Sequence, residues 1–119
     1  MSDFIGIDPE GLARLNKIGG PGFVRKMIDL FLDDAPKRLR AARNGERAGD
    51  LGAIADATHS LKSSAGNFGA DRLARTAEKL ELLTRSNRSE NLSSLLNDLE
   101  EAFAATKAWL ESEKETFKK

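Results

Sequence analysis

The residue best suited to chemistry is His59, the single histidine of this 119-residue chain. It lies in a stretch whose apolar spacing predicts a helix over about 51–67. The apolar centre of that helix falls near Ile54, Thr58 and Ala65, and His59 points roughly 130° away from it. We therefore expect the imidazole to face solvent, where it is available as a nucleophile, a proton acceptor or a ligand.

Small side chains surround His59 on the expected outer face of this helix. Its neighbours one and two turns away are Gly52, Ala55, Asp56, Lys62, Ser63 and Gly66. Four of these six are Gly, Ala or Ser, although each helical glycine costs about 1 kcal/mol of helix stability relative to alanine. Small neighbours leave the imidazole open to close approach by a second protein, and the ammonium of Lys62 lies where an anion on the ring would be held. An exposed histidine without a role is the alternative interpretation.

Other uses of a histidine fit the sequence less well. With no cysteine and one histidine, a tetrahedral zinc site would need three carboxylates, which is a poor ligand set for zinc. No nucleophile elbow accompanies the residues of a Ser-His-Asp triad. No Walker-type glycine loop is present to hold a nucleotide. We therefore expect neither a metal nor another cofactor in this chain.

The charge balance argues against nucleic acid and membranes as partners. Nineteen basic and nineteen acidic residues cancel to a formal charge of zero, so no global field attracts a polyanion. Eighteen apolar residues never run together, and the first residues lack the pattern of a signal peptide. The absence of cysteine suits a reducing compartment. These features favour a cytoplasmic protein, and Met1 with the compact length favours a complete chain.

The elements that must position His59 are helical, because helix-favouring residues dominate and β-branched residues are few. Asp8-Pro9 opens a short helix that Gly19-Gly20 closes. The predicted longer helices cover about 22–43, where Asn44-Gly45 ends the run, then 51–67, 71–85 and a last segment that ends near Glu115. Connections of this length favour antiparallel neighbours. We expect one all-α domain over 1–119, an up-down-up-down four-helix bundle with a short additional N-terminal helix, acting as a monomer.

The segment that begins at His59 and ends at Ala70, HSLKSSAGNFGA, resembles a known family signature. Histidine-containing phosphotransfer (HPt) domains carry a similar motif, roughly H-x-L-K-G/S-S-x-x-x-x-G. Flanking residues also fall where such domains have similar ones: Ile7-Asp8, Leu30-Phe31-Leu32, Ala35-Pro36, Gly49-Asp50 and Leu80-Glu81. The resemblance therefore covers nearly the whole chain. One departure is Ser63, where glycine is most common in the family.

The resemblance implies a phosphorelay carrier without kinase or hydrolase activity of its own. Such domains accept a phosphoryl group from an aspartate of a receiver domain and pass it to another response regulator. Carried onto this sequence, Nε2 of His59 is the acceptor, and Lys62 steadies the phosphoryl oxygens. Glu81 holds the other ring nitrogen, with Glu78 as the alternative. The receiver domain supplies Mg²⁺.

A docking surface is predicted beside His59. The apolar arc of the helix over 22–43 spans roughly 200°, whereas a core-facing helix needs little more than 100°. Phe23 and Leu30 lie at one edge of this arc, and we expect them to form an exposed patch for a helix of a receiver domain. The residues around the histidine complete this surface: Gly52, Ala55, Asp56, Ser63 and Gly66. Coverage of Phe23 and Leu30 by the first helix is the alternative.

Two further functions are open at this stage. One is a helical scaffold that binds receiver domains and carries an idle histidine. The other is a phosphatase that presents a carboxylate or amide from a bundle helix, in which case Glu81 or Asn67 matters more than His59.

Overall fold

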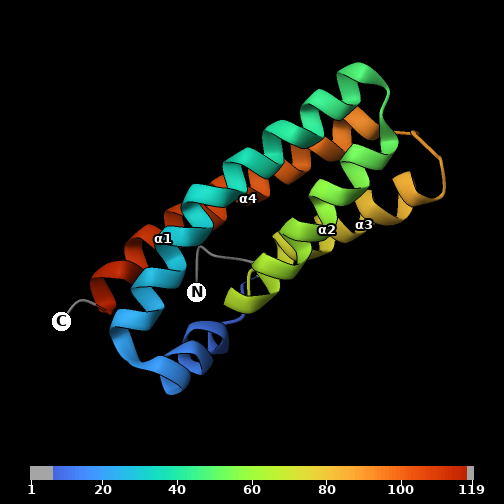
Figure 1. Cartoon of the computed structure of the whole chain (residues 1–119). Helices are drawn as coiled ribbons and strands as arrows, with labels where there is room; N and C mark the ends of the chain where they lie inside the picture. Colours follow the sequence, from blue (N-terminus) through green and yellow to red (C-terminus); the bar gives the residue numbers. More distant parts are fainter. Residues whose placement is uncertain (1–6, 118–119) are drawn as a thin grey trace.

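The computed structural model describes residues 7–117, and these residues form four helices and no strand (Figure 1). The helices are α1 (Glu10–Ala48), α2 (Leu51–Phe68), α3 (Asp71–Arg85) and α4 (Leu92–Thr116). Helix α1 packs against α2, α2 against α3, α3 against α4, and α4 back against α1. Each helix thus has two neighbours around one core, and the predicted all-α four-helix bundle is confirmed.

The first helix is two helices joined at Gly20. This glycine has φ 84° and ψ 178°, which lies outside the helical region and suits a residue without a Cβ atom. The segment before it crosses the end of the bundle, and the segment after it runs along the bundle (Figure 1). The predicted short N-terminal helix, closed by Gly19-Gly20, is therefore present.

Two glycines allow this short helix to pack closely against the end of α2. A Cβ atom on Gly11 would lie 2.2 Å from the carbonyl oxygen of Phe68. At the αL cap of α2, the backbone N–H of Asp8 donates to the carbonyl oxygen of Gly69 at 2.7 Å, and Gly69 has φ 76°. The Asp8 carboxylate in turn accepts the N–H of Glu10 at 2.9 Å, as an N-terminal capping residue does.

The long helix continues past the point where the sequence predicts its end. Asn44-Gly45 does not stop α1, which runs to Ala48 and ends at the αL residue Gly49. Gly45 is buried, and a Cβ atom there would lie 2.8 Å from Cγ1 of Ile54. This glycine serves close helix packing and does not terminate the helix.

The core contains three buried threonines whose hydroxyls are satisfied within their own helices. Thr58, Thr84 and Thr106 each donate to a carbonyl oxygen four residues earlier, at 2.8, 2.7 and 2.8 Å. Because a buried hydroxyl without a partner costs free energy, these bonds allow the threonines to fill apolar positions. Phe31 contacts the rings of Phe68 and Phe103, with centroids 5.2 and 6.0 Å apart, and so ties α1 to α2 and α4.

Ion pairs also join α1 to α4. Arg43 donates to both carboxylate oxygens of Glu100 at 2.9 and 3.0 Å, and also to Glu46 at 2.9 Å. The hydrogen bond from Arg43 lowers the pKa of Glu100 below its ordinary value. Lys114 pairs with Asp29 between the same two helices.

Candidate functional site

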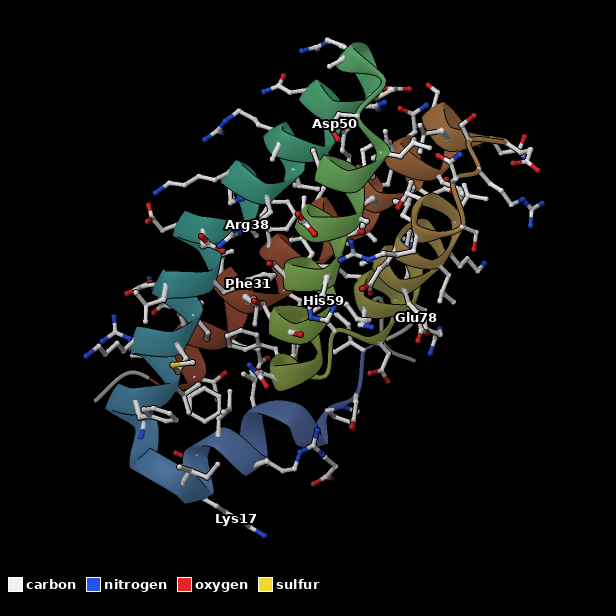
Figure 2. All side chains as sticks on the ribbon, turned by 45° about the vertical axis from the view of Figure 1, so that its right-hand side comes forward. Lys17, Phe31, Arg38, Asp50, His59 and Glu78 are labelled. Carbon is white, nitrogen blue, oxygen red and sulfur yellow. The ribbon has the colours of Figure 1, made fainter. Side chains whose placement is uncertain are left out.

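His59 lies on the outer side of α2, with 57% of its side chain exposed (Figure 2). The short turn of residues 69–70 brings α3 alongside α2, so that Glu81 reaches the ring from the neighbouring helix. Nδ1 of His59 lies 2.9 Å from Oε2 of Glu81. The histidine is therefore exposed and also held in place by a second helix, as the outward position on the helical wheel and the resemblance together predict.

The contact with Glu81 determines which ring nitrogen is free. An ionised carboxylate can only accept hydrogen bonds, so Nδ1 must be the protonated nitrogen of a neutral His59. Nε2 then keeps its lone pair, which makes it the nucleophilic and proton-accepting atom of the site. The carboxylate also stabilises positive charge that develops on the ring when Nε2 forms a bond.

Glu81 itself is largely buried and is kept ionised by its neighbours. Its side chain is 12% exposed, and its Oε1 lies 2.9 Å from Nζ of Lys62. Burial raises the pKa of the Glu81 carboxyl, but the hydrogen bonds and charges of Lys62 and His59 together outweigh burial and hold that pKa below its ordinary value. Glu81 is thus a charged acceptor at neutral pH, and the alternative Glu78 lies exposed elsewhere on α3 (Figure 2).

Lys62 stands one turn after His59 and is a third exposed. In this structure its ammonium is paired with Glu81. Its flexible stem starts on the same face of α2 as the imidazole, so the ammonium can turn toward a group bonded to Nε2.

The small-residue surface around His59 is largely as predicted. Gly52, Ser63 and Gly66 are exposed, and a Cβ atom on Gly66 would meet no atom within 4 Å. The placement of Ala55 on this surface was wrong, since Ala55 is 0% exposed. Because α2 packs against both α1 and α3, its buried arc is wider than one stripe and includes Ala55.

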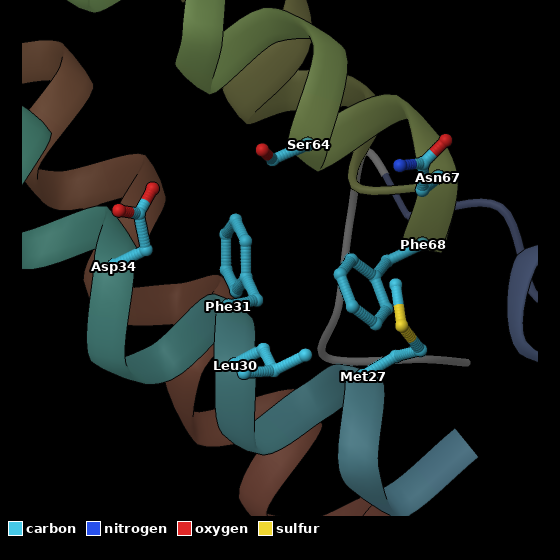
Figure 3. Close-up of a pocket in the computed structure, with 7 residues that line it drawn as sticks. All are labelled: Met27, Leu30, Phe31, Asp34, Ser64, Asn67 and Phe68. Carbon is cyan, nitrogen blue, oxygen red and sulfur yellow. The ribbon is translucent and has the colours of Figure 1, made fainter. Parts of the chain in front are cut away.

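Of the two residues predicted to form an exposed apolar patch, Leu30 is exposed and Phe23 is not. Leu30 is 54% exposed, whereas Phe23 is partly buried against the core. Between α1 and α2 lies a pocket of about 200 Å³ (Figure 3), lined by Met27, Leu30, Phe31, Asp34, Ser64, Asn67 and Phe68. Met27 precedes Leu30 by three residues, a spacing on one helix face that could have indicated its part in the patch.

Sequence reasoning missed Arg85. Its Nη2 lies 3.1 Å from Oδ1 of Asp56, and its Nε lies 4.0 Å from Oε2 of Glu81. The signal was present, because a basic residue four positions after a glutamate on a helix lies beside it. Only the register of α3 against α2, however, brings Asp56 to the same arginine.

A known protein family and a solved structure are similar to this chain. The sequence model of the Hpt domain matches residues 26–109. The search of curated proteins finds no match. Among solved structures, the histidine-containing phosphotransfer protein B (HptB) from Pseudomonas aeruginosa PAO1 is similar to this chain, with a TM-score of 0.90 and 26% sequence identity over 96% of this chain and 98% of that one.

Proposed function

The chain belongs to the Hpt domain family of phosphotransfer carriers, and from this premise we propose that it is a phosphorelay intermediate whose acceptor is His59. In the proposed relay, His59 takes a phosphoryl group from the aspartate of a receiver domain and passes it to a second response regulator. The observation that carries the proposal is the 2.9 Å contact between Nδ1 of His59 and Glu81, which leaves Nε2 as the nucleophilic nitrogen of an exposed ring.

The transfer step uses the lone pair of Nε2. Nε2 attacks the phosphorus atom of the receiver's aspartyl phosphate and a P–N bond forms, while the P–O bond to the aspartate breaks and the carboxylate leaves with the bonding pair. No proton has to move, because Nε2 starts unprotonated and Nδ1 keeps its hydrogen. Glu81 compensates the positive charge on the ring. The reverse step, on a second receiver, regenerates His59.

Lys62 acts on the phosphoryl oxygens in this proposal. A phosphoryl group brings about two negative charges, and the ammonium of Lys62 starts one turn from His59 on the same face. As the resemblance to HPt domains implies, the receiver supplies the Mg²⁺ that neutralises the transferred group in this proposal. The chain then acts as a carrier without kinase or hydrolase activity of its own.

The receiver docks on the face that carries His59. The exposed small residues Gly52, Ser63 and Gly66 let the receiver's aspartate approach the ring closely, and Asp56 lies exposed on the same helix. Leu30, which lines the pocket, offers an apolar contact. Phe23, the other residue predicted for this surface, is partly buried against the core and offers less apolar surface to a partner. We propose that the chain acts as a cytoplasmic monomer with receiver domains as its partners, and not with nucleic acid or a membrane. Within residues 7–117, no helix is long and apolar enough to cross a bilayer.

Transfer from a phosphorylated receiver tests the proposal. The protein is incubated with a receiver domain that carries radioactive aspartyl phosphate, and label on the chain is followed together with its stability in acid and alkali. We expect acid-labile, alkali-stable label on the wild type and none on His59→Gln. Label retained by His59→Gln would contradict the proposal.

The same assay separates the two other functions. Loss of the receiver's phosphate without label on this chain would favour a phosphatase. A stable complex with the receiver and no transfer would favour a scaffold with an idle histidine.

A further inference from the structure

Lys62 and Arg85 both lie near the carboxylate of Glu81, but only Lys62 is in close contact with it. Its Oε1 is paired with Lys62 at 2.9 Å, and its Oε2 accepts from His59 at 2.9 Å. The second cation, Arg85, has its Nε 4.0 Å from the same Oε2. The carboxylate is 12% exposed, so it depends on a neighbouring cation more than a surface glutamate does.

Arg85 has a second partner on α2 that it can leave at little cost. Its Nη2 lies 3.1 Å from Oδ1 of Asp56, and the two side chains are 50% and 77% exposed. Exposed ion pairs contribute little to stability, because solvent screens them and their long side chains lose freedom. Arg85 therefore lies between the exposed carboxylate of Asp56 and the largely buried carboxylate of Glu81.

Phosphorylation of Nε2 changes the competition for these cations. The phosphoryl group brings about two negative charges beside Lys62, which is the nearest ammonium on the same helix face. When Lys62 turns to the phosphoryl oxygens, Oε1 of Glu81 loses its partner. The phosphorylated ring still pairs with Oε2, but an oxygen of a largely buried carboxylate without a partner is costly, so we expect Arg85 to approach.

We propose that Arg85 is a positioning residue that takes over Glu81 when Lys62 turns to the phosphoryl group, and that Asp56 is thereby released. The inference rests on the proposed function, because it requires a phosphoryl group on His59. Glu81 then keeps its charge and its hold on Nδ1 in both states. Asp56 lies three residues before His59 on the exposed face, so its release gives the docking surface a free carboxylate only when His59 is phosphorylated. A receiver can distinguish the two states there.

The first test uses a chemical phosphodonor, which needs no receiver. Phosphoramidate phosphorylates His59 when Nε2 bonds to phosphorus, the P–N bond of the donor breaks and ammonia leaves. The side-chain ¹⁵N signals of Lys62 and Arg85 are then followed by NMR. We expect both to shift with phosphorylation and neither to shift in His59→Gln. Phosphorylated His59 with an unmoved Arg85 signal would overturn the inference, while the proposed function stands or falls separately on transfer from a receiver.

The second test measures the lifetime of the phosphohistidine. Arg85→Gln leaves Lys62 shared between Glu81 and the phosphoryl group, so we expect a lifetime about twofold to fivefold shorter, the range for loss of an exposed ion pair. Arg85→Lys keeps a cation and should restore most of the loss. The matched control is Arg75→Gln, an exposed arginine elsewhere on α3, with an unchanged lifetime.

Unfolding measurements distinguish positioning from a structural role. The unphosphorylated Arg85→Gln protein should melt at the wild-type temperature, because Lys62 still pairs with Glu81 in that state. Lifetimes equal to the wild type in Arg85→Gln, or a shorter lifetime that Arg85→Lys does not restore, would overturn the inference.

A third variant tests the release of Asp56. Asp56→Asn weakens the competing partner of Arg85 in both states, so the Arg85 signal of the unphosphorylated variant should already lie between the two wild-type positions. Phosphorylation should then shift it less than in the wild type. An Arg85 signal that Asp56→Asn leaves at the wild-type position in both states would contradict the exchange.

Discussion

At the scale of single residues, the reactivity of the site depends on one carboxylate. Glu81 selects the tautomer of His59 through Nδ1, and Lys62 and His59 hold its own pKa below the ordinary value against the opposing effect of burial. In the proposed transfer, Nε2 acts as the nucleophile because Nδ1 is occupied by the contact with Glu81. The exposure of His59 alone would leave both tautomers populated.

Removal of this carboxylate should slow transfer. We expect Glu81→Ala to lower the rate of phosphoryl transfer to His59 by about tenfold or more, the usual effect of losing the group that orients a histidine. Single-turnover transfer from a phosphorylated receiver measures the rate. The matched control is Glu78→Ala, an exposed glutamate on the same helix, which should transfer at the wild-type rate. Equal losses in both variants would show that α3, and not the Glu81 carboxylate, is responsible.

The lowered pKa of Glu81 also predicts a pH dependence of stability. An acid whose pKa is lower in the folded state stabilises the fold above its unfolded pKa, near 4.5 for a glutamate, and that contribution is lost as pH falls through the folded pKa. The wild type should therefore lose more free energy of unfolding than Glu81→Gln when pH is lowered from 6 to 3. Urea unfolding at several pH values measures the difference. Parallel curves for the two proteins would contradict this prediction.

The sequence predicted which helix faces the candidate site residues occupy better than it predicted their contacts. The helical wheel correctly placed His59 outward and Thr58 inward, because the period of 3.6 residues depends only on the local helix and can be read from the sequence. Ala55 was misplaced because its burial depends on the helices packed against α2, which the periodicity within α2 does not report. Arg85 was missed for a similar reason, since its pairing with Asp56 requires the register between two helices.

At the scale of elements, glycines determine how the helices meet. Gly11 lets the short N-terminal helix approach the backbone at the end of α2, and Gly45 lets α1 approach Ile54. A sequence shows that a glycine is present but not whether it ends a helix or allows a close contact. For this reason Gly19-Gly20 was predicted correctly as a break, whereas the predicted end of α1 at Asn44-Gly45 was wrong.

The contact at Gly11 predicts a large effect of one methyl group. In Gly11→Ala the new Cβ atom would lie 2.2 Å from a carbonyl oxygen of the backbone, so the short helix must move away from α2. We expect a loss of about 1–3 kcal/mol in the free energy of unfolding, typical of overpacking. Chemical denaturation measures it. Gly22→Ala is the control, because a Cβ atom there meets nothing within 4 Å and should leave stability unchanged or raise it.

At the scale of the whole molecule, the ion pairs that join α1 to α4 and the candidate site lie on different pairs of helices. The pair of Arg43 and Glu100 ties α1 to α4, whereas His59 and Glu81 lie on α2 and α3. The face that carries His59 has the exposed small residues Gly52, Ser63 and Gly66, and Leu30 lines the pocket between α1 and α2. The four-helix architecture followed from helix periodicity and short connections, while the pocket depends on how α1 packs on α2.

Leu30, which lines the pocket, is predicted to contribute to partner binding. Leu30→Ala should weaken binding of a receiver domain by about tenfold, the effect of truncating an apolar residue that is buried in an interface, and should leave the melting temperature unchanged because Leu30 is 54% exposed. Calorimetric titration with the receiver measures the affinity. Ile18→Ala, which removes another exposed apolar side chain at 75% exposure, should bind as the wild type does. Equal affinities in Leu30→Ala and wild type would place the docking surface elsewhere.

Nε2 of His59 is the proposed phosphoryl acceptor, and one measurement addresses that atom directly. Because the chain has a single histidine, protein labelled with ¹⁵N in its histidine ring gives the signals of His59 alone. After transfer from a phosphorylated receiver, we predict phosphorus coupling at Nε2 and a hydrogen retained at Nδ1. Phosphorus coupling at Nδ1, or an unchanged ring spectrum while the receiver loses its phosphate, would contradict the account.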